Sequence, residues 1–224
     1  MDKVALVLVP VALVFCAWFK VDQTAILSTL IVVLALLPFV VRFERSKPKP
    51  RDIMPIIVLA ALAVAGRILF APFPNFKPVS AIIIMAGVCF GRQSGFMTGT
   101  LAALASNLFF GQGPWTPWQM YAWGCMAYTA GLLQDHGVFT RKWLVYAFGF
   151  LAPICYGLIL DTYYFIGFVV DLNLKAALAV YSIGLTGSLI HAAATVTFLI
   201  PLFAPWSKKL SRLKKKYGIE SGVT

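Results

Sequence analysis

Three polar side chains interrupt long apolar stretches of the sequence and are the first candidates for chemistry. Arg67, Asn107 and Asp161 each lie toward the predicted outer end of an apolar segment. A charged side chain within a membrane span costs about 2.5–3.5 kcal/mol on insertion scales and usually faces the interior of a helix bundle. Two interpretations of the charged residues remain open: a structural ion pair between Arg67 and Asp161, or direct contact with a ligand.

A turn-rich segment, residues 107–120, displays aromatic and amide groups together. It reads Asn-Leu-Phe-Phe-Gly-Gln-Gly-Pro-Trp-Thr-Pro-Trp-Gln-Met and contains two glycines and two prolines, which restrict its path. Its exposed groups are predicted to be Gln112, Trp115, Trp118 and Gln119. A rigid aromatic and amide surface suits a flat or partly apolar organic ligand. The alternative is an aromatic belt that lies at the level of the lipid headgroups.

A second segment has the same character and is predicted to lie on the same outer face. Residues 70–78 read Phe-Ala-Pro-Phe-Pro-Asn-Phe-Lys-Pro and include Phe73 and Phe76. Two stiff aromatic loops on one face predict the rim of a binding site. His191 lies nearer the middle of its apolar segment, where a hydrogen bond between helices is a simpler interpretation than a ligand contact.

The motifs of hydrolytic enzymes and of ATPases are missing from the sequence. It contains no H-E-x-x-H, no clustered acidic metal motif, no nucleophile elbow and no Walker A motif. The four cysteines form no C-x-x-C pair, so neither a disulfide framework nor a zinc site is predicted. We therefore expect no catalytic residue, no metal and no cofactor, and active transport would need ATPase partners. An intramembrane enzyme using Arg67, Asp161 and His191, or a stand-alone secondary transporter, is a less favoured alternative.

The composition indicates which elements must position these residues. Hydrophobic residues make up 60% of the 224 residues and charged residues only 12%, against about 25% charged in soluble domains. In lipid each spanning segment must satisfy its own backbone hydrogen bonds, which favours helices. We predict an all-α, polytopic transmembrane helical bundle of about eight helices. The predicted helices span residues 4–19, 24–41, 53–72, 79–91, 95–111, 118–133, 143–170 and 176–205.

The formal net charge of +11 is explained by membrane topology rather than by nucleic-acid binding. Basic residues concentrate in the connector 42–51 and in the tail 208–216, which the positive-inside rule places in the cytoplasm. Both termini are then cytoplasmic, and the lipid bilayer is the expected partner of the basic segments. Three regions follow. They are residues 1–52, with two extra N-terminal helices and the basic connector, residues 53–207, with a six-helix core, and residues 208–224, a basic cytoplasmic tail.

Small residues recur at helical spacing in several of the predicted spans. Ala61 and Ala65 form one such pair, Gly87 and Gly91 another, and Gly95 begins a third stripe that continues at 99 and 103. Helices in lipid associate through close backbone approach, which small residues permit. For any single pair, packing within the molecule is the expected role.

The six-helix block, the Ala61-x-x-x-Ala65 motif on its first helix and the small-residue-rich helix that leads into 107–120 resemble the S-components of energy-coupling factor (ECF) vitamin transporters. The resemblance implies a vitamin-binding subunit of the bacterial cell membrane. It also implies that Ala61 and Ala65 face a transmembrane coupling subunit, which two ABC-type ATPases drive. Substrate is then captured outside and released inside after the subunit topples in the membrane. The two extra N-terminal helices depart from the family pattern.

Residues 113–120 look most like the S-components assigned to cobalamin, which here is a transported substrate and not a cofactor. Another vitamin or a queuosine-type ligand fits the same residues. The predicted substrate-binding residues are Arg67, Phe73, Phe76, Asn107, Gln112, Trp115, Trp118, Gln119 and Asp161.

Overall fold

The computed structural model describes residues 24–219, and all the regular secondary structure in this part of the chain is helical. The predicted helix 4–19 lies outside the described residues. The elements are α2 (Thr24–Arg45), α3 (Pro50–Leu69), α4 (Val79–Phe90), α5 (Arg92–Phe110), α6 (Trp115–Asp135), the short 3₁₀ helix η1 (Val138–Thr140), α7 (Lys142–Phe168) and α8 (Leu174–Tyr217).

The bundle contains helices of the length and polarity that membranes require. Among the described residues α3, α7 and α8 are long and apolar enough to cross a bilayer, which takes about 20 helical residues. The helix α4 is apolar but has only 12 residues. Its bounds agree with the predicted helix over residues 79–91.

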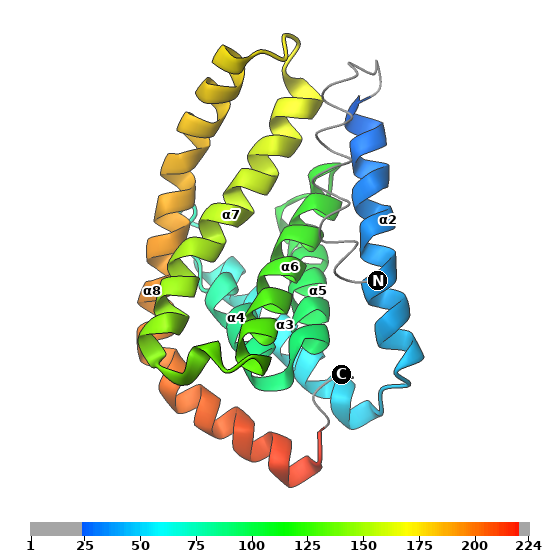
Figure 1. The fold of residues 1–224 in the computed structure, drawn as a ribbon, viewed down its shortest axis with the longest axis vertical. Helices are drawn as coiled ribbons and strands as arrows, with labels where there is room; N and C mark the ends of the chain where they lie inside the picture. The colour runs from blue at the N-terminus through cyan, green and yellow to red at the C-terminus, as the bar shows by residue number, and fades with distance from the viewer. Residues whose placement is uncertain (1–23, 220–224) are drawn as a thin grey trace.

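The arrangement places α4 at the centre. Figure 1 shows α7 and α8 side by side as a long antiparallel pair at one edge of the bundle, with α2 at the other edge. Of the residues in α4, all but Val88 are buried, by packing against α3, α5, α6 and α8. A helix that is apolar on every side is compatible with this burial, and in lipid the burial follows from close packing between helices.

Glycines allow the central helices to approach closely. A Cβ atom added at Gly95 would lie 2.6 Å from Cα of Gly87, and one added at Gly99 would lie 2.5 Å from the carbonyl oxygen of Trp123. Gly91, which joins α4 to α5, has a φ of +90°, a conformation that favours glycine. The predicted packing role of these small residues is confirmed.

The last helix differs from the prediction. We expected a span ending near residue 205 and a separate tail from residue 208, but α8 continues to Tyr217 and includes the basic segment. Pro201 and Pro205 lie within it, and Figure 1 shows the helix changing direction between its upper and lower parts. Proline removes a backbone hydrogen bond and crowds the preceding turn, so it bends a helix without necessarily ending it.

This bend brings the two basic segments to one end of the bundle. An apolar groove of about 410 Å³ is lined by Arg51 and Met54 from α3 and by Leu213 and Tyr217 from α8. The connector before α3 and the end of α8 therefore lie on the same side, as the predicted topology requires. That this side faces the cytoplasm remains a prediction.

Candidate functional site

The loop within residues 107–120 is shorter than predicted: we expected helices ending at residue 111 and starting at residue 118, and α6 starts at Trp115 instead. The helix α5 continues to Phe110 and α6 begins at Trp115, so the loop that connects them consists of residues 111–114. Pro114 is the N-cap of α6 and Pro117 lies in its first turn. Proline is tolerated there because the first backbone N–H groups of a helix have no partner within it.

Four of the predicted polar residues belong to one hydrogen-bond network between α3, α5 and α6. The Arg67 Nη1 donates to Oδ1 of Asn107 at 2.8 Å and also to Oγ of Ser106. The Nδ2 of Asn107, a residue only 1% exposed, donates to Oγ1 of Thr116 at 3.0 Å and to Oε1 of Gln119 at 2.8 Å. Asn107 therefore joins the guanidinium to the first turns of α6.

Gln112 belongs to the same network, but from its exposed edge. The hydroxyl of Thr116 donates to Oε1 of Gln112 at 2.9 Å, and Nε2 of Gln112 donates to the carbonyl oxygen of Leu104 at 3.0 Å. These bonds tie the 111–114 link to both helices. The structure thus gives Gln112 a positioning role for the turn.

Aromatic rings surround the Arg67 guanidinium. Its Cζ lies 4.6 Å from the ring centroid of Phe110 and 5.1 Å from that of Trp123, and Nζ of Lys77 lies 4.8 Å from the Phe110 ring. Cations are attracted to aromatic faces at such distances. Burial, and then the charge of Arg67, lowers the pKa of Lys77 in the 70–78 loop. This loop therefore lies close to the end of α5.

A stack of rings continues from Arg67 into α7 and α8. Tyr156 stacks on Trp123 with centroids 5.1 Å apart and meets His191 edge-on at 5.2 Å. The Nε2 of His191 lies 2.7 Å from Oγ of Ser80 on α4. The predicted hydrogen bond between helices at His191 is confirmed.

This stack ends at a cavity of about 390 Å³ between α7, α8 and the 70–78 loop. Small-molecule sites commonly have volumes of about 300–1,000 Å³. The lining residues are Asn75, Tyr156, Gly157, Leu160, Asp161, Ile183, Gly184, Gly187, Ser188 and His191.

Asp161 lines this cavity and has no cation beside it. Its Oδ2 is buried and has no hydrogen-bond partner among the described residues. The guanidinium of Arg67 instead donates hydrogen bonds to Ser106 and Asn107. The predicted Arg67–Asp161 ion pair is therefore wrong, because Arg67 binds Ser106 and Asn107 whereas Asp161 lines the cavity. Buried polar groups are usually paired, so the unpaired carboxylate oxygen marks a place for a ligand donor.

Glycines keep the cavity open at the contact between α7 and α8. A Cβ atom added at Gly184 would collide with the carboxylate of Asp161, and one added at Gly187 would lie 2.9 Å from Nδ2 of Asn75. Asn75 itself has a φ of +57°, which asparagine tolerates better than most residues. The loop can therefore bring this amide against α8.

The predicted aromatic residues do not converge on one rim. Trp118 is fully buried and packs on Tyr163 at 5.6 Å between ring centroids. Phe76 packs against Phe198 of α8 at 5.5 Å. Phe73 and Trp115 are 57% and 40% exposed. Because α6 begins at Trp115, before the predicted start at residue 118, its helical geometry places Trp118 on a buried face, although we predicted an exposed side chain there.

The two alanines of the small-residue motif lie on an open face of α3. Ala61 and Ala65 are exposed, whereas Ala60 and Ala63 are buried toward the bundle. Neighbouring Val58 is also exposed, at 56%. Among the described residues, this apolar face of α3 is therefore exposed.

Sequence reasoning missed several residues of the cavity. Tyr156 and Ser188 lie in uniformly apolar stretches, and nothing in their spacing distinguishes them from packing residues. Asn75 could have been recognised as a candidate from the sequence, since it is the only amide in the 70–78 segment. Gly184 and Gly187 could also have been recognised, because two glycines this close in a helix allow a neighbouring helix or loop to approach.

Together the fold and the site define a multi-pass helical membrane protein with a cavity of small-molecule size. The sequence of residues 47–208 matches the family model described as ECF-type riboflavin transporter, S component. The chain belongs to this family, which is a family of transporter components and not of enzymes. The match supports the predicted S-component and gives no support to a cobalamin-specific one. No curated protein and no solved structure is similar enough to the chain to be matched with it.

Proposed function

We propose that this chain is the subunit that captures riboflavin outside the cell and delivers it inward together with coupling and ATPase subunits. The observation that carries the proposal is the cavity between α7 and α8, with the Oδ2 of Asp161, which has no hydrogen-bond partner among the described residues, in its wall. The family description names riboflavin as the vitamin.

The chemistry of the cavity suits a flat heterocycle with a polyhydroxylated chain. Tyr156 offers an aromatic ring, and Asp161 accepts hydrogen bonds from hydroxyl or ring N–H groups. Asn75 and Ser188 add a donor and acceptor each at the rim. A volume of about 390 Å³ lies near the lower end of the range for small-molecule sites, which favours riboflavin over the far larger corrinoid ring system.

The hydrogen-bond network behind the cavity acts as its support. Arg67 and Asn107 fix the first turns of α6, and both Arg67 and Tyr156 contact the indole of Trp123. A binding wall held by such contacts loses little freedom when a ligand arrives, which favours affinity. We assign Arg67, Asn107 and Gln119 to positioning in this proposal, and Asp161 to direct contact.

The coupling subunit is proposed to dock on α3. Ala61 and Ala65 are exposed on a face that lacks bulky side chains at these two positions, so another helix can approach the backbone closely there. The cavity borders α7 and α8 instead. Substrate binding and docking can therefore be tested separately.

The test is a titration of the purified chain in detergent with riboflavin, using flavin fluorescence, which stacking against an aromatic ring quenches. We expect saturable binding by the wild type. Asp161→Asn removes a charge-assisted acceptor, worth about 1.5–3 kcal/mol, so its affinity should fall by about 10- to 150-fold. The matched control is Asp171→Asn, which changes an exposed carboxylate in the link between α7 and α8 and should bind normally.

Cobalamin and queuosine are titrated in parallel. Binding of one of these alone would replace the substrate and keep the S-component function. Equal affinities for the Asp161 and Asp171 variants would show that riboflavin binds elsewhere. If none of the ligands binds and no coupling subunit co-purifies, the importer function is wrong for this chain.

A further inference from the structure

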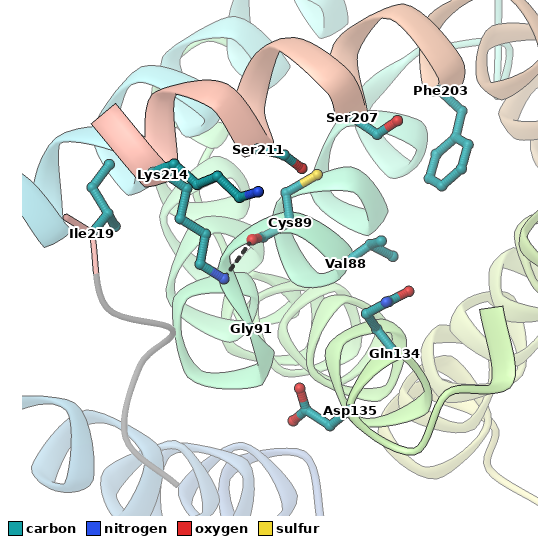
Figure 2. Close-up of a pocket in the computed structure, with 11 residues that line it drawn as sticks. Val88, Cys89, Gly91, Gln134, Asp135, Phe203, Ser207, Ser211, Lys214 and Ile219 are labelled. Atoms are coloured by element: carbon teal, nitrogen blue, oxygen red, sulfur yellow. Dashed lines mark hydrogen bonds between the residues drawn. The ribbon is translucent and has the colours of Figure 1, made fainter. Parts of the chain in front are cut away.

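A second cavity, of about 680 Å³, lies at the opposite end of the bundle from the 70–78 loop. It is lined by the end of α4, the end of α6 and the part of α8 that begins at Phe203 (Figure 2). Its polar lining comes mainly from α8, which contributes Ser207, Ser211, Lys214 and Lys215, with Gln134 opposite on α6.

The cavity carries an excess of positive charge. The Nζ of Lys214 donates to the carbonyl oxygen of Cys89 at 3.1 Å, which holds this ammonium group at the end of α4 (Figure 2). Lys215 is the second lining cation. The one acidic side chain in the lining, Asp135, has Oδ2 only 3.3 Å from Nε of Arg92, so its charge is balanced locally. Two lysines remain for an anion.

The other lining groups indicate which kind of anion fits. The hydroxyls of Ser207 and Ser211 and the amide of Gln134 can donate hydrogen bonds to several oxygens of one group. Val88 and Phe203 give the same cavity an apolar wall. Cationic, hydroxyl and apolar groups together suit a phosphate that is attached to an apolar body.

The position of the cavity indicates where a phosphate attached to an apolar body could come from. Beyond Pro205, α8 carries Trp206 and a series of lysines, and its bend places them at the end of the bundle predicted to face the cytoplasm. Basic segments at this level of a membrane attract anionic lipids. A headgroup of the inner leaflet can therefore reach the lysines from the side.

We propose that this inner cavity binds a phosphate group, supplied by the headgroup of an anionic phospholipid. The site is independent of the vitamin cavity, because the two share no lining residue. Occupation would join α4, α6 and the end of α8 through one ligand. The lipid would then stabilise the bent part of α8 against the bundle.

The experiment measures the thermal stability of the full chain in a neutral detergent during titration with phosphatidylglycerol, phosphatidylcholine or inorganic phosphate. We expect stabilisation by phosphatidylglycerol that saturates and exceeds that of phosphatidylcholine. The variant Lys214→Gln with Lys215→Gln should weaken the apparent affinity by about fivefold per lysine. The control, Lys208→Gln with Lys209→Gln, removes the same charge from the same helix outside the cavity lining.

The outcomes separate the site from general attraction. Equal losses in the two double variants would overturn the proposal, because surface charge alone would then explain the effect. Equal stabilisation by inorganic phosphate would keep the phosphate site and make free phosphate its source. If the cavity variant does not fold, Ser211→Asp keeps both lysines and places a carboxylate beside them. It should abolish the lipid effect, and wild-type lipid binding by this variant would overturn the proposal.

Discussion

Replacing Asn107 by leucine, which is similar in size, tests whether the buried network between α3, α5 and α6 holds the fold. The substitution removes one charge-assisted hydrogen bond to Arg67 and two neutral ones, to Thr116 and Gln119. Such bonds contribute about 1.5–3 and about 0.5–1.5 kcal/mol each. Arg67 keeps its bond to Ser106, so we expect the loss to lie toward the low end of the sum, at about 3 kcal/mol.

The assay is thermal unfolding of the purified chain in detergent, followed by size-exclusion chromatography after heating. For a chain of this size, about 3 kcal/mol corresponds to a Tm lower by about 6–12 °C. Membrane proteins often unfold irreversibly, so all variants are heated at one rate and compared with each other.

A double-mutant cycle then identifies the partner of Arg67. Combining Arg67→Met with Asn107→Leu should give an interaction energy of about 1–3 kcal/mol, since the two residues contact each other. The same cycle with Asp161→Asn is the control and should be additive within about 0.5 kcal/mol. Strong coupling to Asp161 and none to Asn107 would refute the network described above.

Two further predictions concern the face of α3 and the start of α6. Ala61→Trp with Ala65→Trp should abolish co-purification of the coupling subunit while leaving vitamin binding intact, because both positions are exposed and neither lines the cavity. Normal co-purification in an affinity pull-down would remove the docking assignment. Trp118→Ala should lower stability by about 3–5 kcal/mol because the indole is fully buried, whereas Trp115→Ala, at a half-exposed ring, should unfold within a few degrees of the wild type. A larger loss of stability at Trp115 than at Trp118 would contradict the helical start of α6.

The helices themselves followed from local features of the sequence. Long apolar blocks predicted spans because backbone groups in lipid must bond within their own segment. The short fourth segment and the glycine stripe of the fifth, at Gly95 and Gly99, correctly indicated close central packing. The boundaries were predicted less accurately, and two of the errors fell at prolines. Pro117 was taken for loop and Pro205 for an end, yet each lies inside a helix.

The site depended on contacts that no local pattern encodes. Arg67, Asn107 and Asp161 were recognised as polar residues at similar depths, and the structure joins only the first two of them. Their depth could not decide whether Arg67 faces Asn107 or Asp161, because that choice depends on how far each helix is rotated about its axis.

The sequence by itself determined a helical membrane protein, its basic segments and a small-residue face at Ala61, since each of these depends on residue type and spacing along one helix. Tertiary structure alone placed Asp161 in a cavity with Asn75 and Ser188, which are separated by more than a hundred residues. The physical reason is that helix packing in lipid depends on the fit of whole surfaces, set here by glycines such as Gly184. A change of one glycine alters which side chains meet, although it leaves every apolar block unchanged.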